Sequence, residues 1–225
     1  MITSLDRRDL LLFCAMAPAI WVNGAFAQSG STYPITIKVL REGASIEMGA
    51  HFRYALFSHK ADEEGYKGVA YMLTALATSE LIHAQNYGRT LALLRASIDY
   101  PRPQAPAVSD TKANLIFAAD AEINTVDNVY PDILEKLQHE KHEEAIQSVI
   151  YAWESHKQHR DIITKIQKWS PTFFETVARR IDEKSDHYYV CKICGSTLYE
   201  IPAATCPICE HPSTHYSLID QRTFL

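Results

Sequence analysis

The sequence lacks several features that would assign it at once to a functional class. It has no block of basic residues, and 22 lysines and arginines against 27 aspartates and glutamates give a net charge of −5. This balance argues against a dedicated nucleic-acid-binding protein. Five cysteines in 225 residues are too few for a disulfide-dense scaffold. A hydrophobic content of 47% argues against disorder. We therefore expect one or two folded domains with a sizeable core.

The N-terminus has the composition of an export signal. Arg7 and Arg8 precede a short apolar run, which is followed by an Ala-Phe-Ala sequence that ends at residue 27. This order predicts a cleaved signal peptide over residues 1–27, and the paired arginines resemble the twin-arginine class. An uncleaved anchor or a soluble amphipathic helix are the alternatives. The run is too short to span a membrane. We expect a periplasmic protein without a membrane span, and cleavage would remove Cys14 and leave four cysteines.

The apolar pattern of the following residues is helical. A proline-rich linker over residues 99–110 separates two pairs of helices, and its length suits a crossover. Two helix pairs around a long crossover predict a four-helix bundle over residues 28–180. The expected segments are an irregular lead-in over 28–40, helices over about 40–65, 68–97, 111–137 (with Pro131 as a kink) and 142–168, a short helix over 170–180, and a second small domain over 187–225.

Four cysteines near the C-terminus form the most specific motif in the sequence. Cys191 and Cys194 make one C-x-x-C pair, and Cys206 and Cys209 make another after eleven intervening residues. Two such pairs predict a tetrahedral site of four thiolates, which selects zinc or iron. Two disulfides are the alternative reading. The spacing by itself does not separate a structural zinc ribbon from an iron rubredoxin.

Carboxylates and imidazoles recur on the predicted bundle helices. Glu80 and His83 are three residues apart, so both side chains share one face of a helix. A single E-x-x-H pair is weak evidence, because helices contain it often. Two such helices and one glutamate from each of the other two define a di-iron carboxylate site, in which carboxylates bridge the metals and imidazoles complete each sphere.

These motifs resemble the rubrerythrin family. The cysteine pairs, with Tyr188-Tyr189-Val190 before them and His215-Tyr216 after them, resemble its rubredoxin-like domain. Arg53-Tyr54 and Tyr130-Pro131 resemble its bundle helices. The resemblance covers most of residues 40–225 apart from the linker. It implies a mainly α fold, in which a ferritin-like four-helix bundle precedes a small rubredoxin-like domain of strands and cysteine knuckles.

The resemblance also implies the metal ligands. The cysteine site would hold one iron for one-electron transfer, and the bundle would hold one or two non-haem irons, with zinc as the alternative metal in either site. Tyr54 and Tyr130 match tyrosines that brace ligand carboxylates. The positions that match the family's bundle ligands are Glu47, Glu80, His83, Glu122 and His159.

Two positions depart from the family pattern. Thr125 stands where the family usually has a glutamate, and His156 stands where it has the glutamate that bridges the two metals. The donor set becomes three glutamates and three histidines, with His156 included. An imidazole cannot bridge as a carboxylate does, so the site could hold two irons asymmetrically, a mixed pair or one metal. Glu154 would substitute only if the helix shifted its register.

The implied function is reduction of hydrogen peroxide to water. Glu122 or His156 would supply protons, beside Tyr54 and Tyr130, and the cysteine iron would return electrons from a donor that the sequence does not identify. The family further implies a homodimer, in which the cysteine iron of one subunit serves the bundle of another. The alternatives are a non-catalytic metal-binding or redox-sensing protein, an iron oxidase or storage protein, and a helical scaffold with a structural zinc ribbon.

The remaining histidines carry no predicted role. Those near charged runs are expected to be solvated, and those beside the cysteine pairs are expected to lie at the surface or to pack. The first group is His51, His59, His139 and His142, and the second is His187, His211 and His215.

Overall fold

The structure is a computed structural model that describes residues 32–99, 107–167, 176, 181 and 187–220. Residues 31–225 form one unit. The predicted signal peptide lies outside the described residues, and so does nearly all of the short helix predicted over 170–180. No helix in the described part of the chain is long and apolar enough to cross a membrane.

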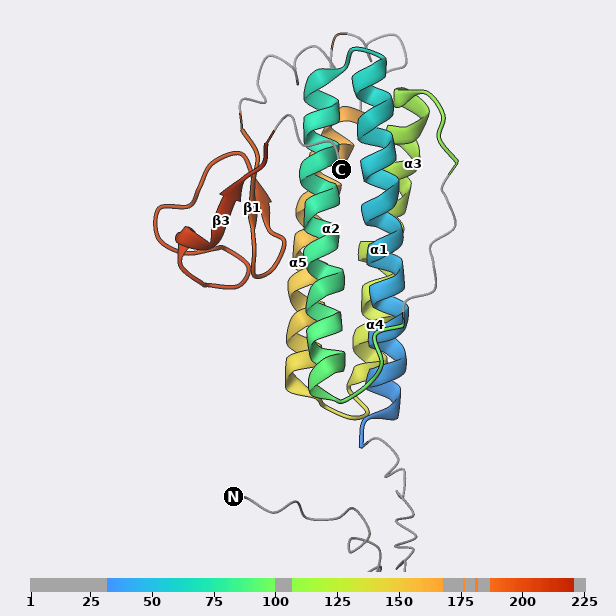
Figure 1. Ribbon diagram of the computed structural model, residues 1–225, viewed down its shortest axis with the longest axis vertical. Coiled ribbons are helices and arrows are strands. Elements are labelled where there is room, and N and C mark those ends of the chain that lie inside the picture. Colours follow the sequence, from blue (N-terminus) through green and yellow to red (C-terminus); the bar gives the residue numbers. More distant parts are fainter. Residues whose placement is uncertain (1–31, 100–106, 168–175, 177–180, 182–186, 221–225) are drawn as a thin grey trace, which may run out of the picture. The chain divides into compact units, whose positions relative to one another are not determined.

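Long helices lie side by side in a four-helix bundle, which confirms the predicted fold class (Figure 1). The first two helices form one hairpin, and a segment with a break in its helical register forms the third helix. The elements are α1 (Pro34–Glu63), α2 (Lys67–Leu93), α3 (Thr111–Asn124), η1 (Thr125–Val129), α4 (Tyr130–Leu137) and α5 (Glu143–Gln167).

Helix α1 begins earlier than predicted. The lead-in expected over residues 28–40 is wrong in its second half, because Pro34 opens the helix. Thr36, Ile37 and Val39, β-branched residues of this segment, turn inward, and packing overrides their weak helix propensity. The Glu140 carboxylate accepts hydrogen bonds from the free N–H groups of Ile35 and Thr36 at 2.9 and 2.8 Å. A distant carboxylate thus caps the first turn.

A π-helical turn, η1, interrupts the third helix and ends two residues before Pro131, at Val129. The amide of Tyr130 bonds to the Thr125 carbonyl in this turn. Pro131 has no N–H to offer the next carbonyl, that of Val126. The indole N–H of Trp153 on α5 donates to that carbonyl instead, at 2.9 Å. The kink expected at Pro131 is therefore a turn with one extra residue, held by a side chain of a neighbouring helix.

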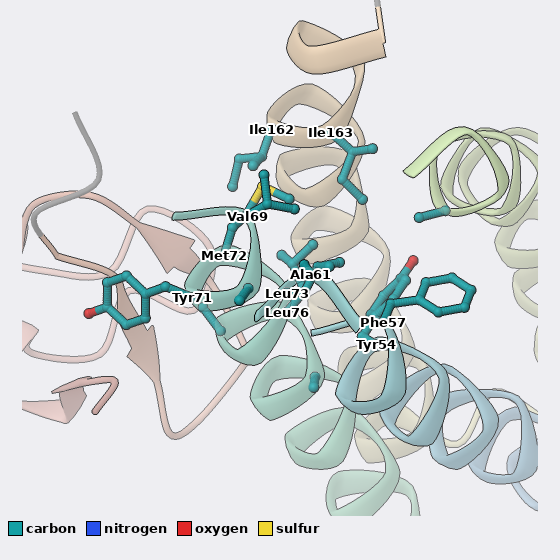
Figure 2. Packing of buried hydrophobic residues seen from close by; sticks show 14 of the residues in the cluster. Tyr54, Phe57, Ala61, Val69, Tyr71, Met72, Leu73, Leu76, Ile162 and Ile163 are labelled. Atoms are coloured by element: carbon teal, nitrogen blue, oxygen red, sulfur yellow. The ribbon is translucent and has the colours of Figure 1, made fainter. Parts of the chain in front are cut away.

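The upper core joins α1, α2 and the end of α5. Phe57 and Ala61 of α1 pack with Leu73 and Leu76 of α2, and Ile163 of α5 closes the cluster (Figure 2). A second cluster fills the other end of the bundle around Leu40, Leu91 and Leu137. The polar residues of the candidate site lie between these two apolar clusters along the helices.

The C-terminal domain is a small antiparallel sheet that carries two cysteine turns. Its strands are β1 (Tyr189–Cys191), β2 (Thr197–Leu198) and β3 (Tyr216–Leu218), in the order β2-β1-β3, with a 3₁₀ turn η3 (Ser213–His215) before β3. The residue after each C-x-x-C pair has a positive φ, +81° at Gly195 and +59° at Glu210. In both turns its N–H bonds back to the carbonyl of the first cysteine. The two turns thus share one backbone geometry.

Candidate metal centres

Four buried thiols form the first candidate centre. Cys191, Cys194, Cys206 and Cys209 are at most 5% exposed, and their sulfur atoms lie within 4.8 Å of one another. The structure has no disulfide among them. The N–H of Ser196 and the hydroxyl of a tyrosine on β3 point at two of the sulfurs. Four converging thiols with donors around them fit a tetrahedral thiolate site.

Six buried carboxylate and imidazole side chains form the second candidate centre, inside the bundle. All of them are at most 2% exposed. They make two overlapping groups of four whose ligand atoms lie within 4.8 Å, and the groups share Glu80 and His156. The six are Glu47 on α1, Glu80 and His83 on α2, Glu122 on α3, and His156 and His159 on α5.

His156 lies at the centre of this second group. Its Nδ1 is 2.7 Å from Glu122 Oε2. Its Nε2 is 3.2 Å from Glu47 Oε2 and 3.2 Å from Glu80 Oε2. The ring therefore touches carboxylates from three other helices. An imidazole thus lies at the point where the three carboxylates converge.

His83 and His159 stand on either side of this ring. His83 Nδ1 is 3.0 Å from Glu80 Oε2 and 3.6 Å from Glu47 Oε2. His159 Nδ1 is 3.2 Å from Glu80 Oε1 and 3.9 Å from Glu122 Oε1. The arrangement is nearly symmetric about Glu80, with one imidazole and one carboxylate on each side.

Two tyrosines brace the outer carboxylates. The Tyr54 hydroxyl donates to Glu122 Oε1 and the Tyr130 hydroxyl donates to Glu47 Oε1, both at 2.5 Å. Burial first, and the nearby carboxylates second, raise the pKa of both phenols well above the usual value, so they keep their hydrogens. Tyr87 in turn donates to Tyr130 at 3.4 Å.

The π-helical turn explains how Glu122 and Tyr130 both face the site. Eight residues of an α-helix advance about 80° beyond two full turns, which would direct the two side chains to different faces. The turn η1 lies between them and takes up one extra residue. Eight residues then cover about two turns. Both side chains are 1% exposed and point into the bundle.

The electrostatics of the bundle site suit a bound cation. Burial would raise the pKa of Glu47 and Glu80, but His156 and the other histidines outweigh it and hold both carboxyls below their usual pKa. Burial opposes the protonation of His156, yet three carboxylates raise its pKa well above the usual value. Glu80 Oε1 and His159 Nδ1 are buried and face each other at 3.2 Å, but neither makes a hydrogen bond within the described part of the chain. Buried carboxylates and imidazoles with free ligand atoms fit iron.

The structure also tests the sequence expectations for Glu154, Thr125 and His51. Glu154 bonds to Lys157 at 2.6 Å and its side chain is 42% exposed, so it does not substitute for a bridging glutamate. Thr125 begins η1 and lies outside the ligand groups. The expectation that His51 is solvated is wrong, because it is 8% exposed and its Nδ1 lies 2.8 Å from the Ala77 carbonyl.

The two candidate centres are in direct contact within one chain. His83 Nε2 lies 3.1 Å from the carbonyl of Cys194. Asn86 donates to the Ile193 carbonyl at 2.9 Å, and Ser79 donates to the Gly195 carbonyl at 2.7 Å. One imidazole therefore connects the bundle carboxylates to the backbone of a cysteine ligand.

Sequence reasoning missed the residues that make this contact. Ser79, Asn86 and Thr197 have common side chains and no motif marks them. Tyr87, which donates to Tyr130, was also missed, although it follows His83 by four residues and so shares its helix face. The others depend on how the small domain meets the bundle, which no local pattern encodes.

Comparison with known proteins assigns the family. The rubrerythrin family model matches residues 38–167, more than half of the chain. The chain belongs to the rubrerythrin family. Its relatives include nigerythrin of Nitratidesulfovibrio vulgaris, 26% identical over 85% of this chain and 90% of the relative. Another is rubrerythrin-2 of Clostridium acetobutylicum, 27% identical over 78% of this chain and 91% of the relative.

Solved structures agree with this assignment. A structure of nigerythrin in a fully reduced, all-ferrous state aligns with a TM-score of 0.68, 26% identity and coverage of 88% of this chain and 91% of that one. The match extends over the bundle and the cysteine domain, so the bundle-plus-rubredoxin architecture is shared. The family and the iron in nigerythrin support iron as the metal of these sites, and nothing in the comparisons supports zinc.

Proposed function

We propose that this protein reduces hydrogen peroxide to water at iron in the bundle, with electrons delivered through the cysteine site. The observation that carries the proposal is the 3.1 Å contact between His83 Nε2 and the Cys194 carbonyl. His83 also lies beside Glu80 and Glu47 at the bundle site. A zinc ribbon or a purely structural bundle would have no use for a short path between the two centres.

Reduction of peroxide needs two electrons and two protons for two molecules of water. When bound, iron in the bundle would supply electrons to the O–O bond, and iron in the cysteine site would restore them one at a time. His156 is the candidate proton donor, because its Nδ1 lies 2.7 Å from Glu122 Oε2 and its ring contacts carboxylates from three helices. Glu122 accepts from His156 Nδ1 and orients the ring.

Tyr54 and Tyr130 hold the outer carboxylates in place. Each phenol donates to one oxygen of its partner and leaves the other oxygen directed at the site. Since the phenols and the six ligand residues are at most 2% exposed, bulk water is excluded from the centre. Peroxide would therefore meet preorganised donors and acceptors in a site of low dielectric.

A second candidate function is a non-catalytic metal-binding or redox-sensing protein. The observation that favours it is His156 itself, whose imidazole lies among three carboxylates and would not bridge two metals as a carboxylate does. With one metal in the bundle, two electrons would not be available at one centre. The choice between these functions therefore depends on how many metals the bundle holds.

Metal analysis of the purified protein with an anaerobic visible spectrum tests the proposal. About three irons per chain would support full occupancy, and about one iron with thiolate-to-iron absorption would leave only the cysteine site active. Zinc alone would refute the redox function. Stopped-flow mixing of the reduced protein with peroxide or with dioxygen then separates peroxide reduction from iron oxidase or storage chemistry, by which oxidant reacts faster.

We also propose a homodimer. Phe52 and Leu56 on α1 and Phe117 on α3 are 42–53% exposed, and exposed apolar side chains on neighbouring helices support an interface. Each chain already contains a contact between its two centres, so the dimer is not needed to bring them together. Light scattering during gel filtration measures the assembly, and a monomer would contradict this proposal.

Export to the periplasm is a further proposal, supported by the composition of residues 1–27. Cell fractionation with N-terminal sequencing of the recovered protein tests it. A mature N-terminus near residue 28 in the periplasmic fraction is expected. Replacement of Arg7 and Arg8 by lysine should retain the protein in the cytoplasm if the signal is of the twin-arginine class.

A further inference from the structure

His83 and His159 each contact the bundle carboxylates with one ring nitrogen and the cysteine domain with the other. The Nδ1 atoms of His83 and His159 face the carboxylates of the bundle site. The Nε2 atoms face the cysteine domain, at 3.1 Å from the Cys194 carbonyl for His83 and 3.4 Å from Thr197 Oγ1 for His159. The small domain thus touches the imidazoles of His83 and His159 on the side away from the bundle carboxylates.

The partner of His83 in the small domain shows that the ring nitrogen facing it carries a hydrogen. A backbone carbonyl only accepts hydrogen bonds. His83 Nε2 must therefore donate to Cys194, and Nδ1 is the atom whose lone pair a metal would use. Metal-ligating histidines commonly gain their orientation from such a partner on the other nitrogen.

The ring of His159 is oriented in the same way, but through hydroxyl groups. The Gly195 carbonyl accepts from Ser79 Oγ at 2.7 Å and from Thr197 Oγ1 at 3.0 Å. A hydroxyl has one hydrogen, so Thr197 Oγ1 has only lone pairs left for His159 Nε2. His159 Nε2 therefore donates to Thr197, and its Nδ1 faces Glu80 Oε1 at 3.2 Å inside the bundle without a hydrogen bond.

Ser155 strengthens this assignment. The hydrogen of Ser79 is already directed to Gly195, so Ser155 Oγ donates to Ser79 Oγ across 3.2 Å. Ser155 Oγ then also presents only lone pairs to His159 Nε2, at 3.4 Å. The hydrogen bonds of this network lead through Ser79 and Thr197 to the Gly195 carbonyl of the first cysteine turn. The position of that turn decides the orientation of His159.

We propose that the cysteine domain sets the metal affinity of the bundle, and that Thr197 is the positioning residue for His159. Metal in the cysteine site orders the turn that carries the Cys194 and Gly195 carbonyls, and the ordered turn holds both imidazoles ready to bind through Nδ1. By linkage, metal in the bundle strengthens metal binding by the cysteines by the same factor. This inference rests on metal binding at both sites and not on peroxide reduction.

Manganese(II) titration of the metal-free, reduced full chain tests the coupling. Mn(II) prefers oxygen and nitrogen ligands over thiolates, so it reports on the bundle, and the loss of its free-ion EPR signal measures binding. The titration is run with the cysteine site empty and with one equivalent of Cd(II) bound there. We expect Cd(II) to tighten Mn(II) binding. Equal Mn(II) affinity with and without Cd(II), or no Mn(II) binding even with Cd(II), overturns the coupling.

Thr197→Val tests the positioning role with Cd(II) bound. Loss of a partner of a ligand histidine typically weakens metal affinity about 10–100-fold, and we expect a loss in this range. Thr205→Val makes the same change at an exposed position of the same domain and should have no effect. Thr197→Ser restores the hydroxyl and should restore affinity.

Nitrogen NMR measures the ring signals of the histidines, which would not change if Thr197 only stabilised the fold. In the metal-free protein, Thr197→Val should change the ring signals of His159 and leave those of His83, which bonds to a backbone carbonyl. The inference is overturned if Thr197→Val and Thr205→Val bind Mn(II) equally, or if serine fails to rescue while the thiolate-Cd(II) absorption is normal. Peroxide turnover is absent from this test, so its failure and the failure of the proposed function are distinguishable.

Discussion

Replacement of Gly195 by alanine tests the contact between the two centres most directly. Gly195 has a φ of +81°. A Cβ at this position would lie 2.6 Å from Ser79 Oγ and 2.9 Å from His83 Cδ2, and closer still to His83 Nε2. The methyl group would therefore push the first cysteine turn away from the very imidazole that connects it to the bundle.

The expected magnitude has two parts. A left-handed conformation costs a non-glycine residue about 1–2 kcal/mol. Separation of the turn from the bundle would also weaken the hydrogen bonds that Ser79 and Thr197 donate to the Gly195 carbonyl, each worth about 0.5–1.5 kcal/mol. The free energy of unfolding should fall by about 2–5 kcal/mol in total.

Gly65→Ala is the matched control. Gly65 has a φ of +85°, and a Cβ there would meet no atom within 4 Å. The control thus carries the backbone strain of about 1–2 kcal/mol without the clash. Urea unfolding compares the two variants, and stopped-flow mixing of the reduced proteins with peroxide follows reoxidation of the cysteine iron. Gly195→Ala should slow that reoxidation and Gly65→Ala should not. Equal stability loss and equal rates in the two variants would refute the close contact.

Three further predictions concern the bundle. His156→Glu should raise the iron content per chain, because a carboxylate can bridge two metals, and an unchanged content in metal analysis would count against His156 as the altered bridge position. In the metal-free protein, the stabilisation from protonated His156 is full below its ordinary pKa of 6.5 and is lost as the pH rises through its raised pKa. Urea unfolding should therefore show a lower free energy of unfolding at pH 9 than at pH 6.5. His156→Gln should flatten this pH dependence. Gly49→Ala should stabilise the protein by about 0.5–1 kcal/mol, since a Cβ there meets nothing within 4 Å. Gly43→Ala should not stabilise it, because its Cβ would lie 3.0 Å from Tyr87, and thermal unfolding measures both variants.

Much of the fold could be predicted from the sequence because its signals are local. The apolar period of the helices and the proline-rich linker predicted a bundle, and the two C-x-x-C pairs predicted a separate sulfur site. The start of α1 was missed, since Pro34 and the following β-branched residues become helical only when Glu140 caps them and the core covers them. The turn η1 was expected only as a kink, because its stabilising partner, Trp153, lies on another helix.

The candidate site shows the same division. Helical spacing indicated Glu80 and His83, and the resemblance to the rubrerythrin family indicated the other four bundle residues. The structure brings all six together within two groups. The position of the His156 ring between three carboxylates could not be read from its substitution alone, because it depends on the separation of four helices. The burial of His51 was missed for the same reason.

The sequence by itself therefore determined which donors this protein has: four thiols in two turns, and carboxylates and imidazoles at helical spacing. Covalent spacing and helical period act over a few residues, so they can be predicted from the sequence. Only the tertiary structure decided how the two centres meet. The Cys194 carbonyl reaches His83, and hydroxyls carry the Gly195 carbonyl's influence to His159, across more than 30 residues of sequence. Hydrogen bonds are directional and short, and their partners are chosen by packing between elements that no local pattern relates.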